Sequence, residues 1–319
     1  MTDINADTAL LQQESGKAAD APAVRWNLDL IVSQLRFSRE VSHNIRPRGI
    51  LRQPPSGAAL AGILEDLSAS LFPTHYGQSE LGRENIDYFV GSTLNSALVA
   101  LIEQVHRSLL FSGDVRGDAE VLHDASAIVR DFATELPSIR GFLVGDVRAA
   151  YRGDPAAGDL YEILLGYPGM TAIIYHRLAH SLYLRGATLV ARLISNIAHS
   201  KTGIDIHPGA EIGGSFFIDH GTGVVIGETS IIGERVRIYQ AVTLGARSFP
   251  ADENGVLIKG NPRHPIIEDD VVIYAGATIL GRVTIGRSST IGGNVWLTRS
   301  VPPNSRISQA RIRDEDAVD

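Results

Sequence analysis

Two adjacent pairs of polar residues stand out in a sequence otherwise rich in glycine and aliphatic residues. Asp219 and His220 interrupt the stretch GSFFIDHGTGVVIGETS at residues 214–230. Arg263 and His264 lie in a later stretch that ends RHPI. An imidazole titrates near neutral pH, so His220 is suited to accept a proton and return it. A guanidinium grips a carboxylate with two parallel hydrogen bonds, which suits Arg263 to binding an acidic group.

A six-residue spacing of aliphatic residues surrounds both pairs and indicates how they are positioned. The spacing runs through three tracts: Ile206, Ile212, Ile218 and Val224; Ile226, Ile232, Ile238 and Leu244; Ile267, Ile273, Ile279, Ile285, Ile291 and Leu297. Neither an α-helix nor a flat strand has this period. A short strand followed by a corner does, and three such hexapeptides, roughly 18 residues, close one triangular coil of a parallel β-helix.

The repeat is broken at two places, each next to a polar pair. A two-residue slip separates Val224 from Ile226, just after His220. The stretch 245–266 carries no repeat, so we predict a protruding loop, and loops of this kind often form the binding face of a solenoid. Asp205 precedes His220 by 15 residues, close to one coil, which predicts that it lies on the neighbouring rung.

The first two thirds of the chain have helical periodicity. We predict helices near 59–71, 85–111, 119–150 and 170–198. The expected organisation is an α+β chain with a disordered arm at 1–24, a helical domain at 25–202, a β-helix at 203–301 with its loop at 245–266, and a tail at 302–319.

Composition excludes several classes of function. The net charge of −7 argues against nucleic acid as the main partner, because phosphate binding requires a basic surface. The absence of cysteine excludes disulfides, thiolate zinc sites and a cysteine nucleophile. No apolar run approaches the roughly 20 residues that span a bilayer, and the start lacks the features of a signal peptide. We therefore expect a cytoplasmic protein with no membrane association.

The motifs DIHP, DHGTG, VTLGA and RHP, in this order on a hexapeptide frame, resemble those of the serine O-acetyltransferase family. RGDPAAGD at 152–159 and GYPGMTAIIYHRLAH at 166–180 extend the resemblance into the helical half. The resemblance implies a left-handed parallel β-helix that forms trimers, with an active site between neighbouring subunits. It implies transfer of acetyl from acetyl-CoA to the hydroxyl of L-serine, the first step of cysteine synthesis from serine, without a metal.

The resemblance also implies a role for individual residues. His220 is the expected general base, because an alcohol is a poor nucleophile until its proton leaves. Asp205 is its expected partner, since a carboxylate fixes the tautomer of such a base and stabilises the imidazolium. Asp154 and Asp219 are expected to bind the ammonium group of serine. Arg263 is expected to bind its carboxylate, and the neighbouring His264 to contact the substrate.

Acetyl-CoA is expected to lie along the β-helix, where small residues let its pantetheine arm approach the main chain. Five small residues occupy the corresponding positions: Gly245, Ala246, Ala275, Gly276 and Gly293. A backbone N–H near Gly245 is a candidate for stabilising the oxyanion.

Three other functions stay open at this stage. A hexapeptide acyltransferase for a sugar, an antibiotic or an amino-group acceptor would keep the catalytic histidine. A zinc carbonic anhydrase on the same frame would need three histidines around one metal, for which His207, His220 and His264 are numerous enough. A non-catalytic β-helix scaffold would leave the intact DHGTG motif unexplained.

The resemblance implies several partners. L-serine is the expected acceptor, and relatives assemble as a homotrimer or a dimer of trimers, between which the sequence does not decide. Relatives often show feedback inhibition by cysteine and dock a terminal isoleucine into O-acetylserine sulfhydrylase. Asp319 stands where that isoleucine is expected, so this docking is in doubt.

Overall fold

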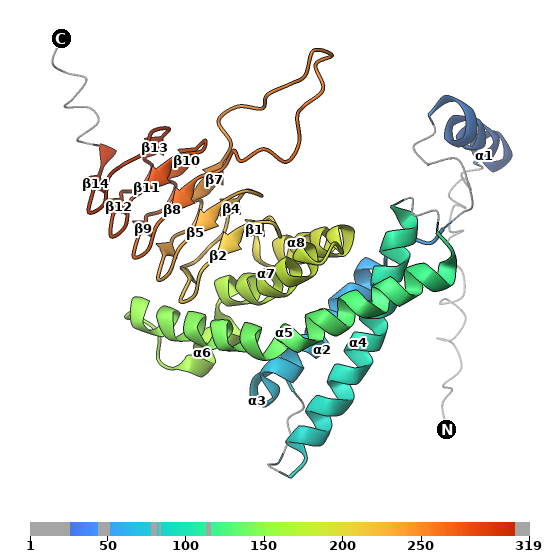
Figure 1. The fold of residues 1–319 in the computed structure, drawn as a ribbon, viewed down its shortest axis with the longest axis horizontal. Coiled ribbons are helices and arrows are strands. Elements are labelled where there is room, and N and C mark those ends of the chain that lie inside the picture. Colours follow the sequence, from blue (N-terminus) through green and yellow to red (C-terminus); the bar gives the residue numbers. More distant parts are fainter. Residues whose placement is uncertain (1–25, 44–51, 78–81, 83, 113–115, 310–319) are drawn as a thin grey trace, which may run out of the picture. The chain divides into compact units, whose positions relative to one another are not determined.

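The computed structural model describes residues 26–43, 52–77, 82, 84–112 and 116–309 (Figure 1). The chain divides into two compact units, residues 1–50 and 51–319. The described part of the first unit is helix α1 (Leu28–Phe37), capped by the side chain of Asn27, followed by a π-helical turn at Ser38–Ser42. The predicted arm at 1–24 lies outside the described residues.

The second unit begins with helices, whose bounds are α2 Gly57–Leu71, α3 Pro73–Tyr76, α4 Ile86–Phe111, α5 Asp118–Gly153, α6 Leu160–Gly166, α7 Pro168–Leu184 and α8 Thr188–Thr202. The helices predicted near 59–71, 85–111 and 119–150 are confirmed as α2, α4 and α5. The single helix predicted at 170–198 is wrong: α7 and α8 are separated at 185–187, where Gly186 has a φ of +86°. Within the described part of the chain, no helix is both long and apolar enough to cross a membrane.

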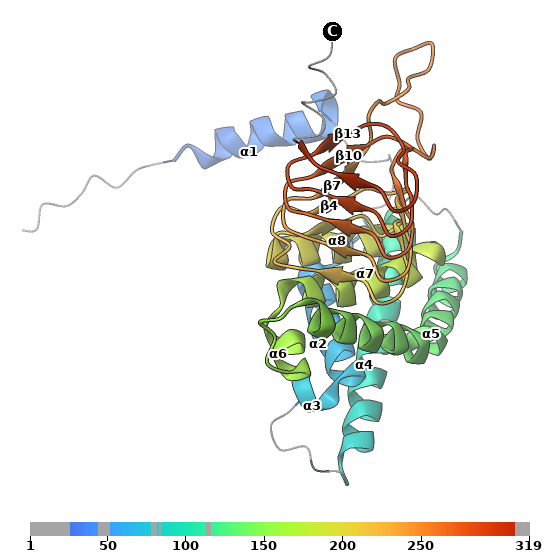
Figure 2. The same cartoon turned by 90° about the vertical axis from the view of Figure 1, so that its left-hand side faces the viewer.

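The described residues after α8 form fourteen short strands in three parallel sheets (Figure 2). Sheet A contains β1 (Asp205–Ile206), β4 (Val225–Ile226), β7 (Thr243–Gly245), β10 (Thr278–Leu280) and β13 (Trp296–Leu297). Sheet B contains β2 (Glu211–Ile212), β5 (Ile231–Ile232), β8 (Ile266–Ile267) and β11 (Thr284–Ile285). Sheet C contains β3 (Phe217–Ile218), β6 (Arg237–Ile238), β9 (Val272–Ile273), β12 (Thr290–Ile291) and β14 (Arg306–Ile307).

These sheets are the three sides of the left-handed parallel β-helix predicted from the sequence. Aliphatic residues of the six-residue pattern take equivalent places on successive rungs, as Ile206, Ile226 and Leu244 do in sheet A. All three are at most 4% exposed. β14 continues sheet C into the stretch predicted as tail, by pairing with β12.

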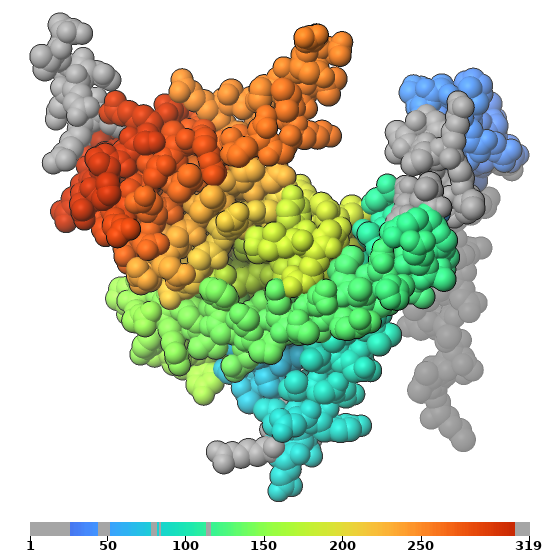
Figure 3. All heavy atoms as spheres, viewed as in Figure 1, coloured from blue at the N-terminus to red at the C-terminus, as the bar shows by residue number. Residues whose placement is uncertain are grey.

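The two breaks in the repeat correspond to two enlarged corners of the β-helix. The turns from sheet C to sheet A, here called the C–A corner, span four residues at 239–242 and 274–277 but six at 219–224. The slip in the sequence is therefore a longer turn that contains Asp219 and His220. At the A–B corner, where the chain turns from sheet A to sheet B, residues 246–265 between β7 and β8 form a loop that projects from the surface in orange (Figure 3).

A buried ion pair attaches the helices to the strand that leads into the 219–224 turn. Arg177 on α7 donates to both carboxylate oxygens of Asp146 on α5, at 2.7 and 2.9 Å. Asp146 also accepts from the backbone N–H of Phe216 at 2.9 Å, and Arg177 donates to the carbonyl oxygen of Gly213 at 2.8 Å. These bonds fix the position of β3, and hence the start of the turn, relative to α5 and α7.

Candidate active site

His220 lies in the enlarged turn with a backbone φ of +59°. A positive φ is uncommon for a residue with a side chain, although histidine is among the residues enriched there. The next residue, Gly221, has a φ of +88°, and a Cβ at this position would lie 2.4 Å from Cδ1 of Ile204. The turn therefore requires a glycine after the histidine. It holds the His220 side chain outward, with 69% of it exposed.

Asp219 and Asp154 lie on the same side of the β-helix as His220. Oδ1 of Asp219 is 3.9 Å from Nδ1 of His220, and its side chain is only 9% exposed. Asp154 ends α5 and accepts from the hydroxyl of Tyr167 at 2.6 Å and from the backbone N–H of Ala156 at 2.8 Å. These two hydrogen bonds are the largest causes that lower the pKa of Asp154, with smaller contributions from nearby charges that include His220. Two carboxylates and the imidazole thus gather at the C–A corner.

Two residues that the sequence analysis did not single out hold these carboxylates. Tyr167 holds Asp154, and Nη2 of Arg237 on β6 is 2.9 Å from Oδ2 of Asp219. Tyr167 lies within the recognised stretch GYPGMT, so the motif offered a signal for it. Arg237 pairs in register with Phe217, one coil earlier, and only the pairing of rungs identifies it as a neighbour of Asp219.

A second group lies at the A–B corner, where the loop returns to the β-helix. Nη2 of Arg263 is 2.6 Å from Oε2 of Glu228. The hydroxyl of Thr229 accepts from the backbone N–H groups of both Arg263 and His264, and the backbone N–H of Thr229 donates to Nδ1 of His264 at 3.1 Å. His264 is 7% exposed. The arginine and histidine of RHP are therefore held at the opposite end of sheet A from His220.

Two histidines at this corner are neutral at physiological pH. Burial, followed by the charge of Arg263, lowers the pKa of His264 to about 4. Burial, followed by the charge of Arg192, lowers the pKa of His207 to about 4. Neither imidazole is a cation at neutral pH, so both act in the site as hydrogen-bonding groups.

Asp205 lies on β1, opposite Val225 on the next rung, and is half-buried. No hydrogen bond or ion pair joins it to His220 among the described residues of one chain. Its charge acts instead on His207 at the A–B corner. One subunit alone therefore does not hold Asp205 and His220 in contact.

The five small residues expected to contact acetyl-CoA also divide between the two corners. Gly245 and Ala246 lie where the loop leaves β7, whereas Ala275, Gly276 and Gly293 lie at the C–A corner. A Cβ on Gly245 would lie 2.8 Å from Cδ2 of Leu280, and one on Gly276 would lie 2.2 Å from Oδ1 of Asn294. Gly276 also has a φ of +73°, so the fold of the chain itself favours a glycine there. Gly293 is exposed, and a Cβ at this position would lie 3.2 Å from the carbonyl oxygen of Ala275, which accepts from the backbone N–H of Asn294.

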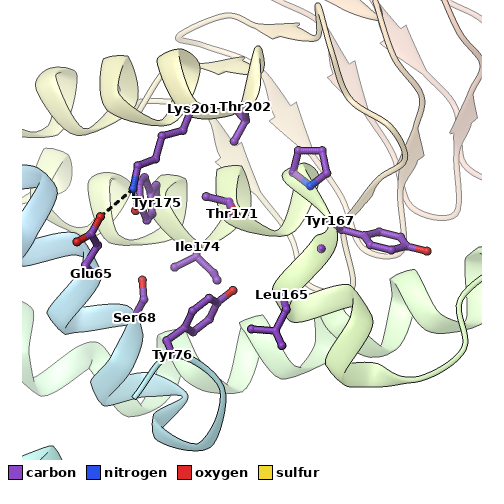
Figure 4. Close-up of a pocket in the computed structure, with 12 residues that line it drawn as sticks. Glu65, Ser68, Tyr76, Leu165, Tyr167, Thr171, Ile174, Tyr175, Lys201 and Thr202 are labelled. Atoms are coloured by element: carbon purple, nitrogen blue, oxygen red, sulfur yellow. Dashed lines mark hydrogen bonds and ion pairs between the residues drawn. The ribbon is translucent and has the colours of Figure 1, made fainter. Parts of the chain in front are cut away.

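A separate cavity of about 580 Å³ lies between α2, α3, α7 and α8, behind the backbone of Tyr167 (Figure 4). The Tyr167 side chain points away from this cavity, and a Glu65–Lys201 ion pair lies on its other side. None of the candidate catalytic or binding residues lines it. The chemistry is therefore expected at the corners of the β-helix.

The three histidines considered for a zinc site are not brought together within one chain. His220 lies at the C–A corner and His207 and His264 at the A–B corner. The described residues contain no group of three or more His, Cys, Asp or Glu side chains able to hold a metal ion.

Comparison with known proteins gives one consistent result. Residues 264–299 match the family model described as bacterial transferase hexapeptide (six repeats). A plasmid-encoded serine acetyltransferase of Synechococcus elongatus is 57% identical over 300 residues, which cover 91% of this chain and 93% of that protein. The structure is similar to that of serine acetyltransferase 1 of Entamoeba histolytica in complex with L-cysteine, with a TM-score of 0.69 and 38% identity over 82% of this chain and 89% of that one. It is also similar to the Neisseria gonorrhoeae serine acetyltransferase in complex with serine, with a TM-score of 0.51 and 29% identity over 78% of this chain and 94% of that one.

Proposed function

This chain belongs to the serine acetyltransferase family, and we propose which of its residues carry out the transfer and how they are assembled. The enzyme moves an acetyl group from acetyl-CoA to the hydroxyl of L-serine and releases O-acetyl-L-serine and coenzyme A. This reaction begins the synthesis of cysteine from serine. A sugar or antibiotic acceptor has no comparable support.

His220 is the proposed general base. It takes the proton of the serine hydroxyl while that oxygen attacks the thioester carbonyl carbon, and it returns the proton to the sulfur as the C–S bond breaks. The exposed position of the imidazole on an enlarged turn supports this role. Asp205 remains its proposed partner, and the contact forms only in the assembled site, since one subunit does not hold the two residues together. A backbone N–H near Gly245 is the proposed donor to the developing oxyanion.

Asp154 and Asp219 are proposed to bind the ammonium group of serine. Both carboxylates lie at the corner that holds His220, and the lowered pKa of Asp154 keeps it ionised well below neutral pH. If the ammonium group of serine is bound between these two carboxylates, the hydroxyl group on the adjacent Cβ is directed towards the imidazole of His220. Asp154 and Asp219 would thus have two functions: they select an amino acid as the acceptor, and they orient it for the reaction.

Arg263 is proposed to bind the carboxylate of serine, with His264 as a hydrogen-bonding neighbour. In one subunit these residues lie at the opposite end of sheet A from His220. We therefore propose a homotrimer in which the C–A corner of one subunit faces the A–B corner of the next, with acetyl-CoA along the same boundary. The division of the site residues between two corners is the observation on which this arrangement depends.

Subunit complementation tests the arrangement. His220→Asn removes the base, and Arg263→Met removes the carboxylate clamp. When the two variants are co-expressed in equal amounts, about a quarter of the sites in randomly mixed trimers combine an intact His220 with an intact Arg263 of the neighbour. Thiol release, measured at a serine concentration well below the KM of the Arg263→Met variant, should recover to that extent. Recovery should be absent when the two variants are purified separately and assayed without subunit exchange.

A site formed entirely by the residues of one subunit would give a different result. Each mixed trimer would then contain only defective sites, and activity would stay at the level of the separate variants. The same experiment with Asp205→Asn and His220→Asn determines whether the base and its partner come from different subunits.

A further inference from the structure

Arg237 donates a hydrogen bond to the side chain of Asp219. Nη2 of Arg237 lies 2.9 Å from Oδ2 of Asp219, and the two side chains are 24% and 9% exposed. Oδ1, the other oxygen of Asp219, lies 3.9 Å from Nδ1 of His220. One oxygen thus contacts the arginine while the other lies on the side of the catalytic imidazole.

Aromatic rings hold the guanidinium of Arg237 in place. Its central carbon lies 5.1 Å from the centre of the Phe217 ring and 4.7 Å from that of Tyr239. Tyr239 in turn stacks on Tyr274, with ring centres 5.1 Å apart and planes 13° apart. A guanidinium next to two rings loses little freedom when it binds a carboxylate, because it is already fixed. The contacts with Phe217 and Tyr239 therefore restrict the position of the Arg237 guanidinium.

The charges at this corner match the proposed ligand. Asp154 and Asp219 contribute two negative charges, and Arg237 contributes one positive charge beside them. With the imidazole neutral, the group carries one net negative charge, which a single ammonium balances. Without Arg237 the nearly buried Asp219 would lack a partner, and such a carboxylate turns towards solvent or takes up a proton.

We propose that Arg237 is a positioning and specificity-determining residue, which holds Asp219 so that one carboxylate oxygen binds the amino group of the acceptor. The inference rests on the proposed role of Asp219 in binding serine. Arg237 makes no contact with the reacting atoms and acts mainly through Asp219, while its charge makes a smaller contribution to the lowered pKa of Asp154. Its removal should weaken the binding of serine much more than it slows the chemical step.

Steady-state kinetics of Arg237→Met tests the proposal. The KM for serine should rise about tenfold, while kcat falls by less than about threefold. The KM for acetyl-CoA should be unchanged. A fall in kcat with an unaltered KM for serine would overturn the proposal.

A double-mutant cycle separates positioning from a general structural effect. In an Asp219→Asn background the carboxylate is already lost, so adding Arg237→Met should change the KM for serine by less than about twofold. Equal effects of Arg237→Met in both backgrounds would show that it does not act through Asp219. If Asp219→Asn alone leaves serine kinetics unaltered, the proposed function of Asp219 is wrong, whereas an effect of Asp219→Asn without one of Arg237→Met rejects only the present inference.

Two further variants complete the experiment. Arg235 lies two residues before Arg237, in the turn that precedes β6, and forms an exposed ion pair with Asp270 at 2.6 Å. Arg235→Met breaks this pair, and its serine kinetics should match the wild type. Arg237→Lys keeps the positive charge but loses the planar guanidinium that lies beside the rings of Phe217 and Tyr239, and it should give an intermediate KM. If Arg237→Met does not fold, Arg237→Lys in the two backgrounds provides the same cycle, and an unchanged KM for serine there would also reject the inference.

Discussion

The hydroxyl of Tyr167, the residue before α7, donates a 2.6 Å hydrogen bond to Oδ2 of Asp154 at the end of α5. The bond spans thirteen residues and the whole of α6, and it fixes the position of the carboxylate that is proposed to bind the ammonium group of serine. It is the largest cause of the lowered pKa of Asp154.

We expect Tyr167→Phe to raise the KM for serine by about fivefold, which corresponds to about 1 kcal/mol, the typical net contribution of one hydrogen bond, with little change in kcat. The reason is that Asp154 stays ionised at neutral pH but keeps only its hydrogen bond from the backbone N–H of Ala156, so its position is less well fixed. Serine-dependent thiol release measures both constants. Tyr161→Phe is the matched control, since Tyr161 is 60% exposed on α6 and stacks on His75 instead. An equal rise in both variants would contradict the role of the hydrogen bond.

Replacing His220 should abolish turnover without unfolding the chain. Asparagine is the suitable replacement, because it adopts the positive φ of this turn more readily than alanine does. We expect His220→Asn to lower kcat by about 10²–10⁴-fold, with an unchanged thermal unfolding temperature. Turnover near the wild-type level would remove His220 as the general base.

The Asp146–Arg177 pair should be essential to stability, because both side chains are almost fully buried. Arg177→Met leaves an uncompensated buried carboxylate and should lower the free energy of unfolding by about 3–5 kcal/mol. Urea unfolding at a fixed protein concentration measures the loss. Asp146→Asn combined with Arg177→Met should recover part of it, since no buried charge remains. A stability loss no larger in Arg177→Met than in the exposed Arg235→Met variant would contradict this account.

Stability should also fall in a defined pH range. The folded chain holds the pKa of His207 and His264 at about 4, below the ordinary value of 6.5. Between these values the unfolded chain binds more protons than the folded chain, so the contribution of both residues is full above pH 6.5 and is lost as the pH falls towards 4. Urea midpoints at pH 7, 6 and 5 should decrease in that order.

His264→Gln should make this decrease smaller, because one of the two groups no longer titrates. His123→Gln is the control, since the side chain of His123 is 79% exposed. If the slope of stability against pH is identical in the wild type and His264→Gln, then His264 is not held neutral by the fold.

The repeating architecture and the motif residues could be predicted from the sequence. Inward aliphatic residues at every sixth position are required wherever a triangular coil closes, so spacing alone predicted the rungs of the β-helix. The two-residue slip after Val224 was visible in the sequence, but the enlarged turn of Asp219 and His220 to which it corresponds was seen only in the structure.

Which side chains meet became known only from the packed chain. Arg237 contacts Asp219 because parallel rungs place residues about one coil apart side by side, and Tyr167 reaches Asp154 because α6 folds back between them. Arg263 lies apart from His220 within one chain because the two residues occupy different corners of the β-helix. Local periodicity predicts which residues of a strand or helix face the core. Hydrogen bonds and ion pairs between distant segments cannot be predicted in this way, because they form only after those segments pack against each other.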